Sequence, residues 1–147
     1  MALYRSTNKE AKMYELLSSF LTDYIFRIPA IRMAEAQALQ HSGRTFMYEF
    51  AWRAPTFEGL IGACHTMQIP FVFDNLHVPG VEGLRGPNPP QQLANTMHSA
   101  FVNFAKTGDP GWPQYELAHR ETMRFDTISE VVKDPHSIER VFWEGKR

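Results

Sequence analysis

The segment from residue 45 to residue 52 constrains the fold most, because its aromatic residues recur at every second position. Four of them occupy alternate positions: Phe46, Tyr48, Phe50 and Trp52. Successive side chains of a β-strand point to opposite faces, so this period predicts a strand, and Pro55 is expected to stop it. The flanking segments have helical periods instead. The chain is therefore expected to combine a sheet with helices.

Two helices are expected before this strand. Thr7 and Glu10 have the spacing of a capping box. Apolar residues then recur at helical intervals: Met13, Leu17, Phe20, Leu21 and Tyr24. This pattern predicts a helix that begins near Thr7 and packs its apolar stripe against the rest of the fold. Pro29 is expected to open a second helix that runs to about Gln40, with Gly43 in the turn after it.

A proline-rich loop and a long helix are expected after the strand. Residues 77 to 90 contain four prolines and three glycines, which predicts a surface loop. Pro89 is expected to begin a helix that Gly108 ends. Its apolar stripe would consist of Leu93, Met97, Ala100, Phe101, Phe104 and Ala105.

The remaining residues predict a turn, a hairpin and a short helix. The turn after Gly108 carries Trp112 as an aromatic anchor. Residues 122–127 and 129–133 are expected to pair as an edge hairpin. Asp134 and Pro135 are then expected to cap a last helix that contains Ile138, Val141 and Phe142.

Composition indicates one folded domain over residues 1–147. Hydrophobic residues make up 44% of the chain and aromatic residues 13%, which argues against disorder. A net charge of −1 and a pI of about 6.6 predict no nucleic-acid or membrane partner. No apolar run approaches the roughly 18 residues of a membrane span. Cys64 is the one cysteine, which excludes an intrachain disulfide and suits a cytoplasmic location.

Residues 62–74 carry the clearest signal for chemistry. His65 lies there between small residues and an apolar, aromatic run, which is the setting of a catalytic base with room for substrate on one side. A histidine in such a setting is, taken alone, more often a core residue. The other histidines have no metal-ligand spacing and are expected at the surface or at helix caps: His41, His77, His98, His119 and His136.

Several segments, in a consistent order, resemble the C-terminal part of type B carboxylesterases, the cholinesterase-like branch of the α/β-hydrolases. They are residues 21–30, 45–50, 62–65 with 69–73, and 101–110 with 112–115. The resemblance spans nearly the whole chain and looks closest to bacterial members. It implies an α/β fold class: the C-terminal segment of an α/β-hydrolase fold, helix-rich with a few strands and lacking most of the central sheet.

The resemblance implies ester hydrolysis by a serine, an acidic residue and a histidine, with His65 as the catalytic histidine. No cofactor or metal is implied. The serine and the acid precede the histidine in this fold, and the chain contains no Gly-x-Ser-x-Gly. The chain is therefore expected to be inactive alone and to act on a small ester only when the N-terminal part is present. Candidates to line the substrate pocket are Tyr24, Phe26, Phe71 and Phe73.

Local substitutes for the missing triad members are weak. Ser18 and Ser19 fall inside a helix, where a hydroxyl usually meets solvent or a carbonyl. Glu58 lies in a loop seven residues before His65, and Cys64 adjoins His65, although sequence neighbours usually point apart.

Two other functions stay open. One is a non-enzymatic interaction module, and the other is the complementing half of a split esterase. Because helices and strand would lack the sheet that covers them in the parent fold, the isolated chain is expected to associate with itself through exposed apolar surface.

Overall fold

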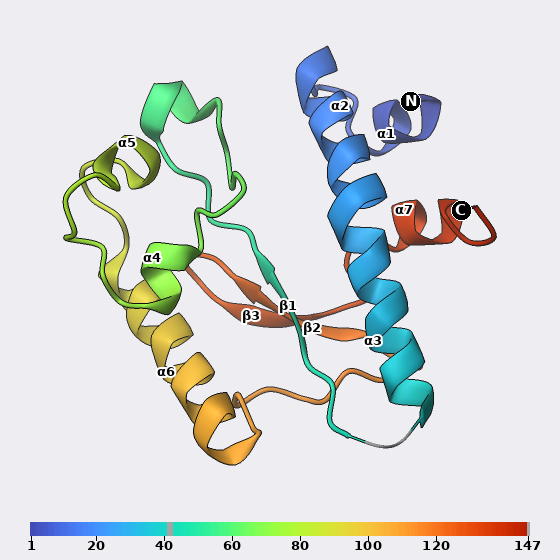
Figure 1. Cartoon of the computed structure of the whole chain (residues 1–147). Coiled ribbons are helices and arrows are strands. Elements are labelled where there is room, and N and C mark those ends of the chain that lie inside the picture. Colours follow the sequence, from blue (N-terminus) through green and yellow to red (C-terminus); the bar gives the residue numbers. More distant parts are fainter. Residues whose placement is uncertain (41–42, 147) are drawn as a thin grey trace. The chain divides into compact units, whose positions relative to one another are not determined.

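The computed structural model describes residues 1–40 and 43–146, which form two compact units (Figure 1). Unit 1 comprises Met1–Thr45, Tyr115–Arg120 and Asp134–Arg147, and unit 2 comprises Phe46–Gln114 and Glu121–Lys133. The chain passes from one unit to the other at four places, so neither unit is a continuous segment. The expectation of one domain over residues 1–147 stays a prediction.

A three-stranded sheet in the order β1-β2-β3 is the centre of unit 2. Its strands are β1 (Met47–Phe50), β2 (Glu121–Phe125) and β3 (Glu130–Lys133). β2 and β3 form an antiparallel hairpin, whereas β1 and β2 pair in parallel. The expected strand and the expected hairpin are confirmed, each with shorter strands, but β2 is the central strand, so only β3 lies at an edge. The parallel pair had no local signal, because the long helix and several short helical turns separate its strands in the sequence.

The helix α6 (Gln91–Thr107) packs against β1 in unit 2 (Figure 1). The rings of Phe101 and Tyr48 meet edge to face with centroids 5.4 Å apart. Gly108 ends the helix in the left-handed conformation with φ of 71°, which costs glycine little. The expected helix, its end and its buried residues Leu93, Met97 and Ala100 are confirmed.

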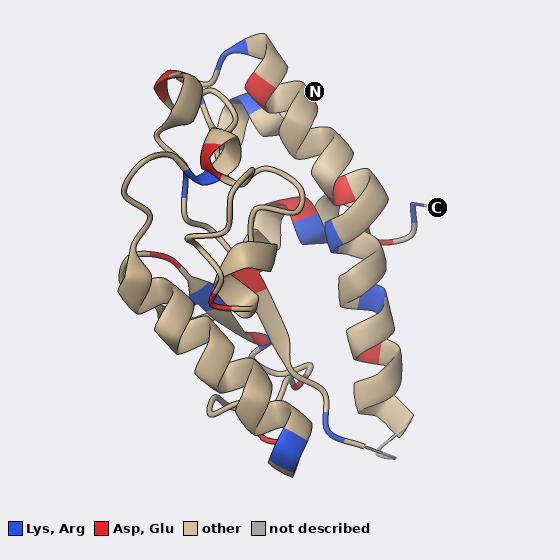
Figure 2. Ribbon diagram, turned by 60° about the vertical axis from the view of Figure 1, so that its left-hand side comes forward, with Lys and Arg blue, Asp and Glu red and all other residues tan. Residues whose placement is uncertain are grey.

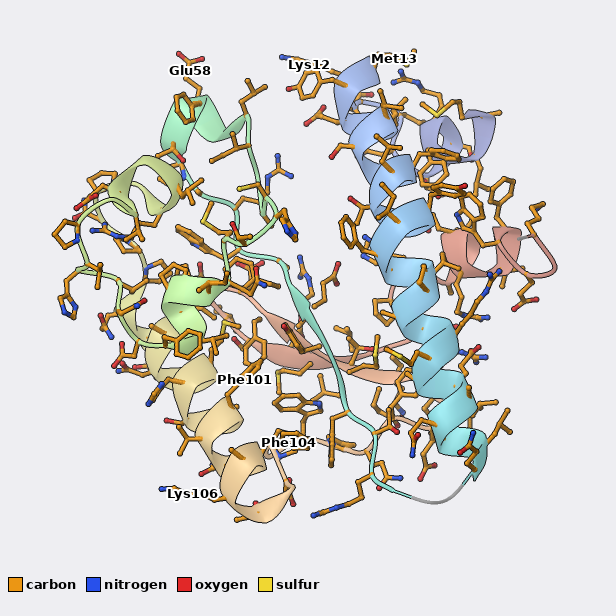
Figure 3. The ribbon with its side chains drawn as sticks, viewed as in Figure 1. Lys12, Met13, Glu58, Phe101, Phe104 and Lys106 are labelled. Carbon is orange, nitrogen blue, oxygen red and sulfur yellow. The ribbon has the colours of Figure 1, made fainter. Side chains whose placement is uncertain are left out.

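The last turn of α6 departs from the expected stripe. Phe104 is 46% exposed and Ala105 is exposed as well. The Phe104 ring lies nearly perpendicular to the Phe46 ring, with centroids 5.9 Å apart. In Figure 3, Phe104 lies one turn below Phe101 and close to the end of the helix that Lys106 marks.

Trp112 anchors the turn after α6, as expected. The indole is 9% exposed and packs edge to face against Phe125 at 5.7 Å and Phe46 at 6.2 Å. The same core contains Phe71 and Met67, which are fully buried. Helix, turn and sheet therefore share one hydrophobic core within unit 2.

Helices make up most of unit 1. They are α1 (Ala2–Thr7), α2 (Met13–Thr22), the π-helical turn η1 (Asp23–Arg27), α3 (Ile28–Gln40) and α7 (Ser137–Phe142). α2, η1 and α3 follow one another as a continuous rod (Figure 1). The second helix thus begins beside Pro29, as expected, but without a break from α2. The wider π-turn before Pro29 suits a residue that has no N–H to donate.

The predicted capping box at Thr7 is wrong. Thr7 is the last residue of α1, and its hydroxyl donates to the Tyr4 carbonyl at 3.3 Å. Glu15 has the capping role that was expected of Glu10, because its carboxylate accepts the Lys12 N–H at 2.7 Å where α2 begins. The chain turns between the two helices, and this turn brings Tyr4, Ala11 and Leu16 together in a small buried cluster.

The apolar stripe expected on α2 is only partly the face that unit 1 buries. Met13, Leu17 and Leu21, which belong to that stripe, are 65%, 49% and 42% exposed. Phe20, also a member of the stripe, lies on the inner face together with the buried Leu16. The ring of Phe20 packs against Tyr4 and Trp143, with centroids 5.7 and 5.4 Å apart, so partners distant in sequence select the inner face.

The predicted cap of the last helix is also wrong. His136, in the left-handed conformation, precedes α7. Asp134 instead accepts two hydrogen bonds of 2.8 Å from the Arg140 guanidinium. This two-point pair holds the chain that leads into the helix. Ile138 and Val141 are exposed on its outer side.

A buried polar network joins three elements of unit 1. The Tyr4 hydroxyl donates to Asp23 Oδ2 at 2.6 Å and accepts the Trp143 indole N–H at 2.8 Å. Arg27 Nη1 lies 2.9 Å from Asp23 Oδ1. Asp23 is fully buried, and this burial raises the pKa of its carboxyl above the ordinary value. The network ties α1 to η1 and to the end of α7.

Charged residues are dispersed along the elements of both units, and α2, η1 and α3 together carry both acidic and basic residues (Figure 2). α6 carries one Lys, Arg, Asp or Glu, which is Lys106 in its last turn. A cation there complements the helix dipole. Over residues 1–40 and 43–146, every helix is too short or too polar to cross a membrane.

Candidate functional site

The histidine segment follows β1 in unit 2. Between them the chain makes an excursion through the short turn η2 (Thr56–Gly59), which closes where the Ala54 N–H donates to the Gly62 carbonyl at 3.3 Å. His65 then lies in a turn that leads into α4 (Ile69–Val72). The Met67 N–H donates to the Cys64 carbonyl at 3.1 Å, which closes this turn around His65.

Buried residues on either side hold this turn in place. Met67 and Phe71 have no exposed surface. The Phe71 ring packs against Trp52 at 5.1 Å and Phe50 at 5.3 Å. His65 itself is exposed. The core-histidine interpretation is therefore wrong: the imidazole is presented at the surface of unit 2 by a turn whose neighbours are fixed in the core.

Hydrogen bonds between α4 and α6 hold the segment that follows His65. His98 Nδ1 lies 2.9 Å from the Val72 carbonyl oxygen. The Gln91 amide donates to Asp74 Oδ1 at 2.6 Å. A side chain on so constrained a segment keeps its position without a large entropic cost. His98, which was expected at the surface or at a helix cap, is half-buried within α6 and contacts the last residue of α4.

The local substitutes for a nucleophile or an acid gain no support. Glu58 lies at the exposed tip of η2 and points outward in Figure 3. Within the described ranges no hydrogen bond or ion pair joins Glu58 to His65. Cys64 packs against the core while His65 is exposed, so the two side chains diverge. Ser18 and Ser19 are exposed in the middle of α2.

The four candidates for the substrate pocket lie in different settings. Tyr24 and Phe26 belong to η1 in unit 1, where they are 40% and 54% exposed. Phe73 is 66% exposed at the end of α4, whereas Phe71 is a core residue of unit 2. A role in substrate binding stays a prediction for all four.

Tyr24 also borders a hollow in unit 1. The hollow has a volume of about 220 Å³, smaller than most ligand pockets. Its lining consists of Tyr24, Ile28, Pro29, Arg32, Trp143 and Lys146. Arg32 Nη2 donates to the carbonyls of Trp143 and Lys146, both at 2.8 Å. The Arg32 guanidinium therefore holds the backbone at Trp143 and Lys146.

Arg53 and Arg85 are features that the sequence did not single out. The Arg53 guanidinium lies against the backbone of Gly62, so that a Cβ built there would be 3.3 Å from Cζ. Arg85 is buried, although the surrounding Leu84 and Gly86 give no signal of it. Only the structure reveals the contact of Arg53 with Gly62 and the burial of Arg85.

The other histidines show no metal arrangement. In the part of the chain that the structure describes, no three His, Cys, Asp or Glu side chains are placed to hold a metal ion. His77 and His119 are exposed, in line with the expectation, and His136 is the N-cap of α7. His41 lies outside the described residues.

Comparison with known proteins identifies the family of this chain. The sequence profile of the Carboxylesterase family matches residues 2–143. The chain belongs to this family. It is 36% identical over 128 residues to the para-nitrobenzyl esterase of Bacillus subtilis. This match covers 82% of this chain and 25% of that protein. It is also 28% identical over 132 residues to the phenmedipham hydrolase of Pseudarthrobacter oxydans.

Solved carboxylesterase structures have the same fold. A Geobacillus stearothermophilus carboxylesterase superposes with a TM-score of 0.81 at 34% identity, over 95% of this chain and 30% of that one. A thermophilic PNB esterase gives 0.75 at 31% identity, over 96% and 30%. The resemblance to α/β-hydrolases is therefore confirmed, with a helix-rich part and a small sheet. The chain spans about a quarter to a third of the length of these carboxylesterases.

Proposed function

We propose that this chain supplies the catalytic base, His65, to an ester hydrolase site whose remaining groups lie in a larger carboxylesterase. The observation that carries the proposal is the exposed imidazole on a turn anchored by Met67 and Phe71, in a chain of the carboxylesterase family. A general base needs both access and a fixed position, and this turn supplies both.

In such a site the imidazole accepts the proton of a serine hydroxyl as its oxygen attacks the ester carbonyl. The same proton then passes to the leaving alcohol, and water repeats the cycle to free the acid. Without the serine, the chain alone offers only the slow general-base reactivity of any exposed imidazole. It is therefore proposed to be inactive on its own.

The test supplies the missing part. The chain is mixed or co-expressed with the portion of the Bacillus subtilis para-nitrobenzyl esterase that it does not cover, and hydrolysis of para-nitrophenyl acetate is followed. Turnover above that of either part alone is expected, and His65→Ala is expected to lower it at least 100-fold.

His77→Ala is the matched control, because His77 is another exposed histidine of unit 2. This variant is expected to keep full complemented activity and to equal the wild type in the slow background of the isolated chain. Complemented turnover that survives His65→Ala would contradict the proposal. So would turnover by the isolated chain that depends on His65.

A second candidate, an interaction module, is favoured by the exposed apolar face of α2. Met13, Leu17 and Leu21 recur there every four residues and are all at least 42% exposed. Such a row is typical of a helix that packs against another protein surface. We propose that it pairs copies of the isolated chain.

Size-exclusion chromatography with light scattering tests this pairing. Leu17→Lys is expected to shift the chain toward monomer, whereas Ser18→Lys, one residue away on the same helix, is not. A wild-type chain that stays monomeric at high concentration and binds no hydrophobic dye would rule the pairing out.

A further inference from the structure

Arg85 is a buried cation in unit 2 that forms no close ion pair with any described residue. It is the last residue of α5 (Glu82–Arg85), and only 8% of its surface is exposed. Its Nη1 donates to the Gly86 carbonyl at 2.7 Å, and its buried Nε has no hydrogen-bond partner. Among residues 1–40 and 43–146, no carboxylate lies within 4.0 Å of the guanidinium.

This arrangement is energetically incomplete. A guanidinium carries five N–H donors and stays charged at any physiological pH. Removing such a charge from water is costly unless an anion or several acceptors replace the water. Backbone hydrogen bonds and, more weakly, the charge of Arg85 lower the pKa of the Glu82 carboxyl, but Glu82 forms no ion pair with the guanidinium. Glu82 is exposed, and its carboxylate accepts the Gly80 N–H at 2.7 Å.

The corner around Arg85 is fixed by its neighbours. α5 lies beside the turn η2 (Figure 1), and the Thr56 hydroxyl donates to the Leu84 carbonyl at 2.9 Å. Gly86 has φ of 74°, and a Cβ there would lie 3.1 Å from Pro55 Cγ. Only glycine permits this close approach. The Gly86 carbonyl in turn orients the guanidinium, so the donors are positioned in advance.

We propose that Arg85 is the binding site for a carboxylate group. The planar guanidinium pairs with a carboxylate through two parallel hydrogen bonds. A compact monoanion also loses less hydration than a phosphate dianion on entering a site that is nine-tenths buried. The carboxylate belongs either to a small free acid or to an Asp or Glu side chain of the larger carboxylesterase. This inference stands apart from the role of His65.

The first experiment measures thermal unfolding of the full chain in sodium acetate and in sodium chloride of equal ionic strength. Acetate at ten times its dissociation constant is expected to raise the melting temperature by about 4–5 °C. Arg53→Met, which removes an exposed arginine of the same unit, is expected to keep this response. Arg85→Met is expected to lose it, and to melt no lower than the wild type in chloride, because it removes an unpaired buried charge.

The second experiment needs no variant. It follows the Nε–H resonances of the arginines in the wild-type chain by nitrogen-15 NMR. A saturable shift of the Arg85 resonance with acetate supports a free acid as the ligand. A shift that requires the remaining portion of a carboxylesterase supports a side-chain carboxylate. A resonance that responds to neither overturns the proposal, as does an Arg85→Met variant that folds but is clearly less stable than the wild type in chloride.

Discussion

Replacing Tyr4 by phenylalanine is expected to lower the free energy of unfolding by about 4 kcal/mol, although the ring keeps its shape. The change removes the 2.6 Å hydrogen bond to the buried Asp23 carboxylate, and a hydrogen bond to a charged group is worth about 1.5–3 kcal/mol. It also leaves the Trp143 N–H without its acceptor at 2.8 Å, which costs about 1–3 kcal/mol. Such a loss is a large part of the 5–15 kcal/mol that stabilises an ordinary domain.

The loss is expected to depend on pH. Burial raises the pKa of Asp23 in the folded chain, and the Tyr4 hydroxyl opposes that rise. A group with a raised folded pKa stabilises fully below its unfolded pKa, near pH 4 for aspartate, and this stability is lost as the pH rises through the folded pKa. Tyr4→Phe raises the folded pKa of Asp23 further, so its cost is expected to be larger at pH 7 than at pH 4.

The assay is urea unfolding followed by circular dichroism at both pH values. Tyr14→Phe is the control, because Tyr14 is 44% exposed on the neighbouring helix α2. A Tyr4→Phe loss below about 1 kcal/mol at pH 7, or equal to the loss in Tyr14→Phe, would refute the reasoning. A loss of the same size at both pH values would refute the part assigned to the Asp23 charge.

Three further substitutions have outcomes that the structure orders clearly. Phe71→Ala is expected to cost about 3–5 kcal/mol in urea unfolding, and Phe73→Ala, at a 66% exposed residue, less than about 0.5 kcal/mol; equal losses would contradict the core position of Phe71. Tyr115→Phe is expected to leave stability unchanged or raised at pH 7, since its buried hydroxyl has no partner among the described residues. Burial raises the pKa of Tyr115 to about 12. The neutral Tyr115 side chain therefore contributes its full share to stability below about pH 10, and this contribution is lost as the pH rises toward 12. The phenylalanine variant does not titrate there and shows no such loss. Phenolate absorbance during alkaline titration checks the raised pKa. Gly108→Ala, at φ of 71°, is expected to cost about 1 kcal/mol by thermal unfolding, and Gly83→Ala, where a Cβ meets nothing, no more than a few tenths.

Local pattern predicted the elements whose partners are set by their own sequence. The alternating aromatic residues before Pro55 predicted β1, and the apolar stripe that ends at Gly108 predicted α6. Trp112 was predicted as an anchor because a rigid turn follows that helix. In each case the side chains that face the core recur at the period of the element itself.

Pattern failed where a distant residue decides what is buried. The expected stripe of α2 is divided: Phe20 contacts Tyr4 and Trp143 on the inner face, whereas Met13, Leu17 and Leu21 stay exposed. Asp23 and Arg85 are charged, which predicts exposure, yet both are buried. The choice of His65 as the expected catalytic histidine followed from the family resemblance. The exposure of His65 followed only from the structure, because the anchoring of its turn depends on residues from several elements.

The hydrogen bond from Trp143 to Tyr4 spans 139 positions of the chain. During synthesis, at about 5–20 residues per second, Tyr4 waits several seconds before its partner exists. Over that interval α1 and α2 leave the ribosome without Trp143, which covers their inner face in the folded chain. The apolar row of Met13, Leu17 and Leu21 is exposed beside that face. Transiently exposed apolar surface favours aggregation, so we expect the nascent chain to be most prone to aggregate before α7 has been synthesised.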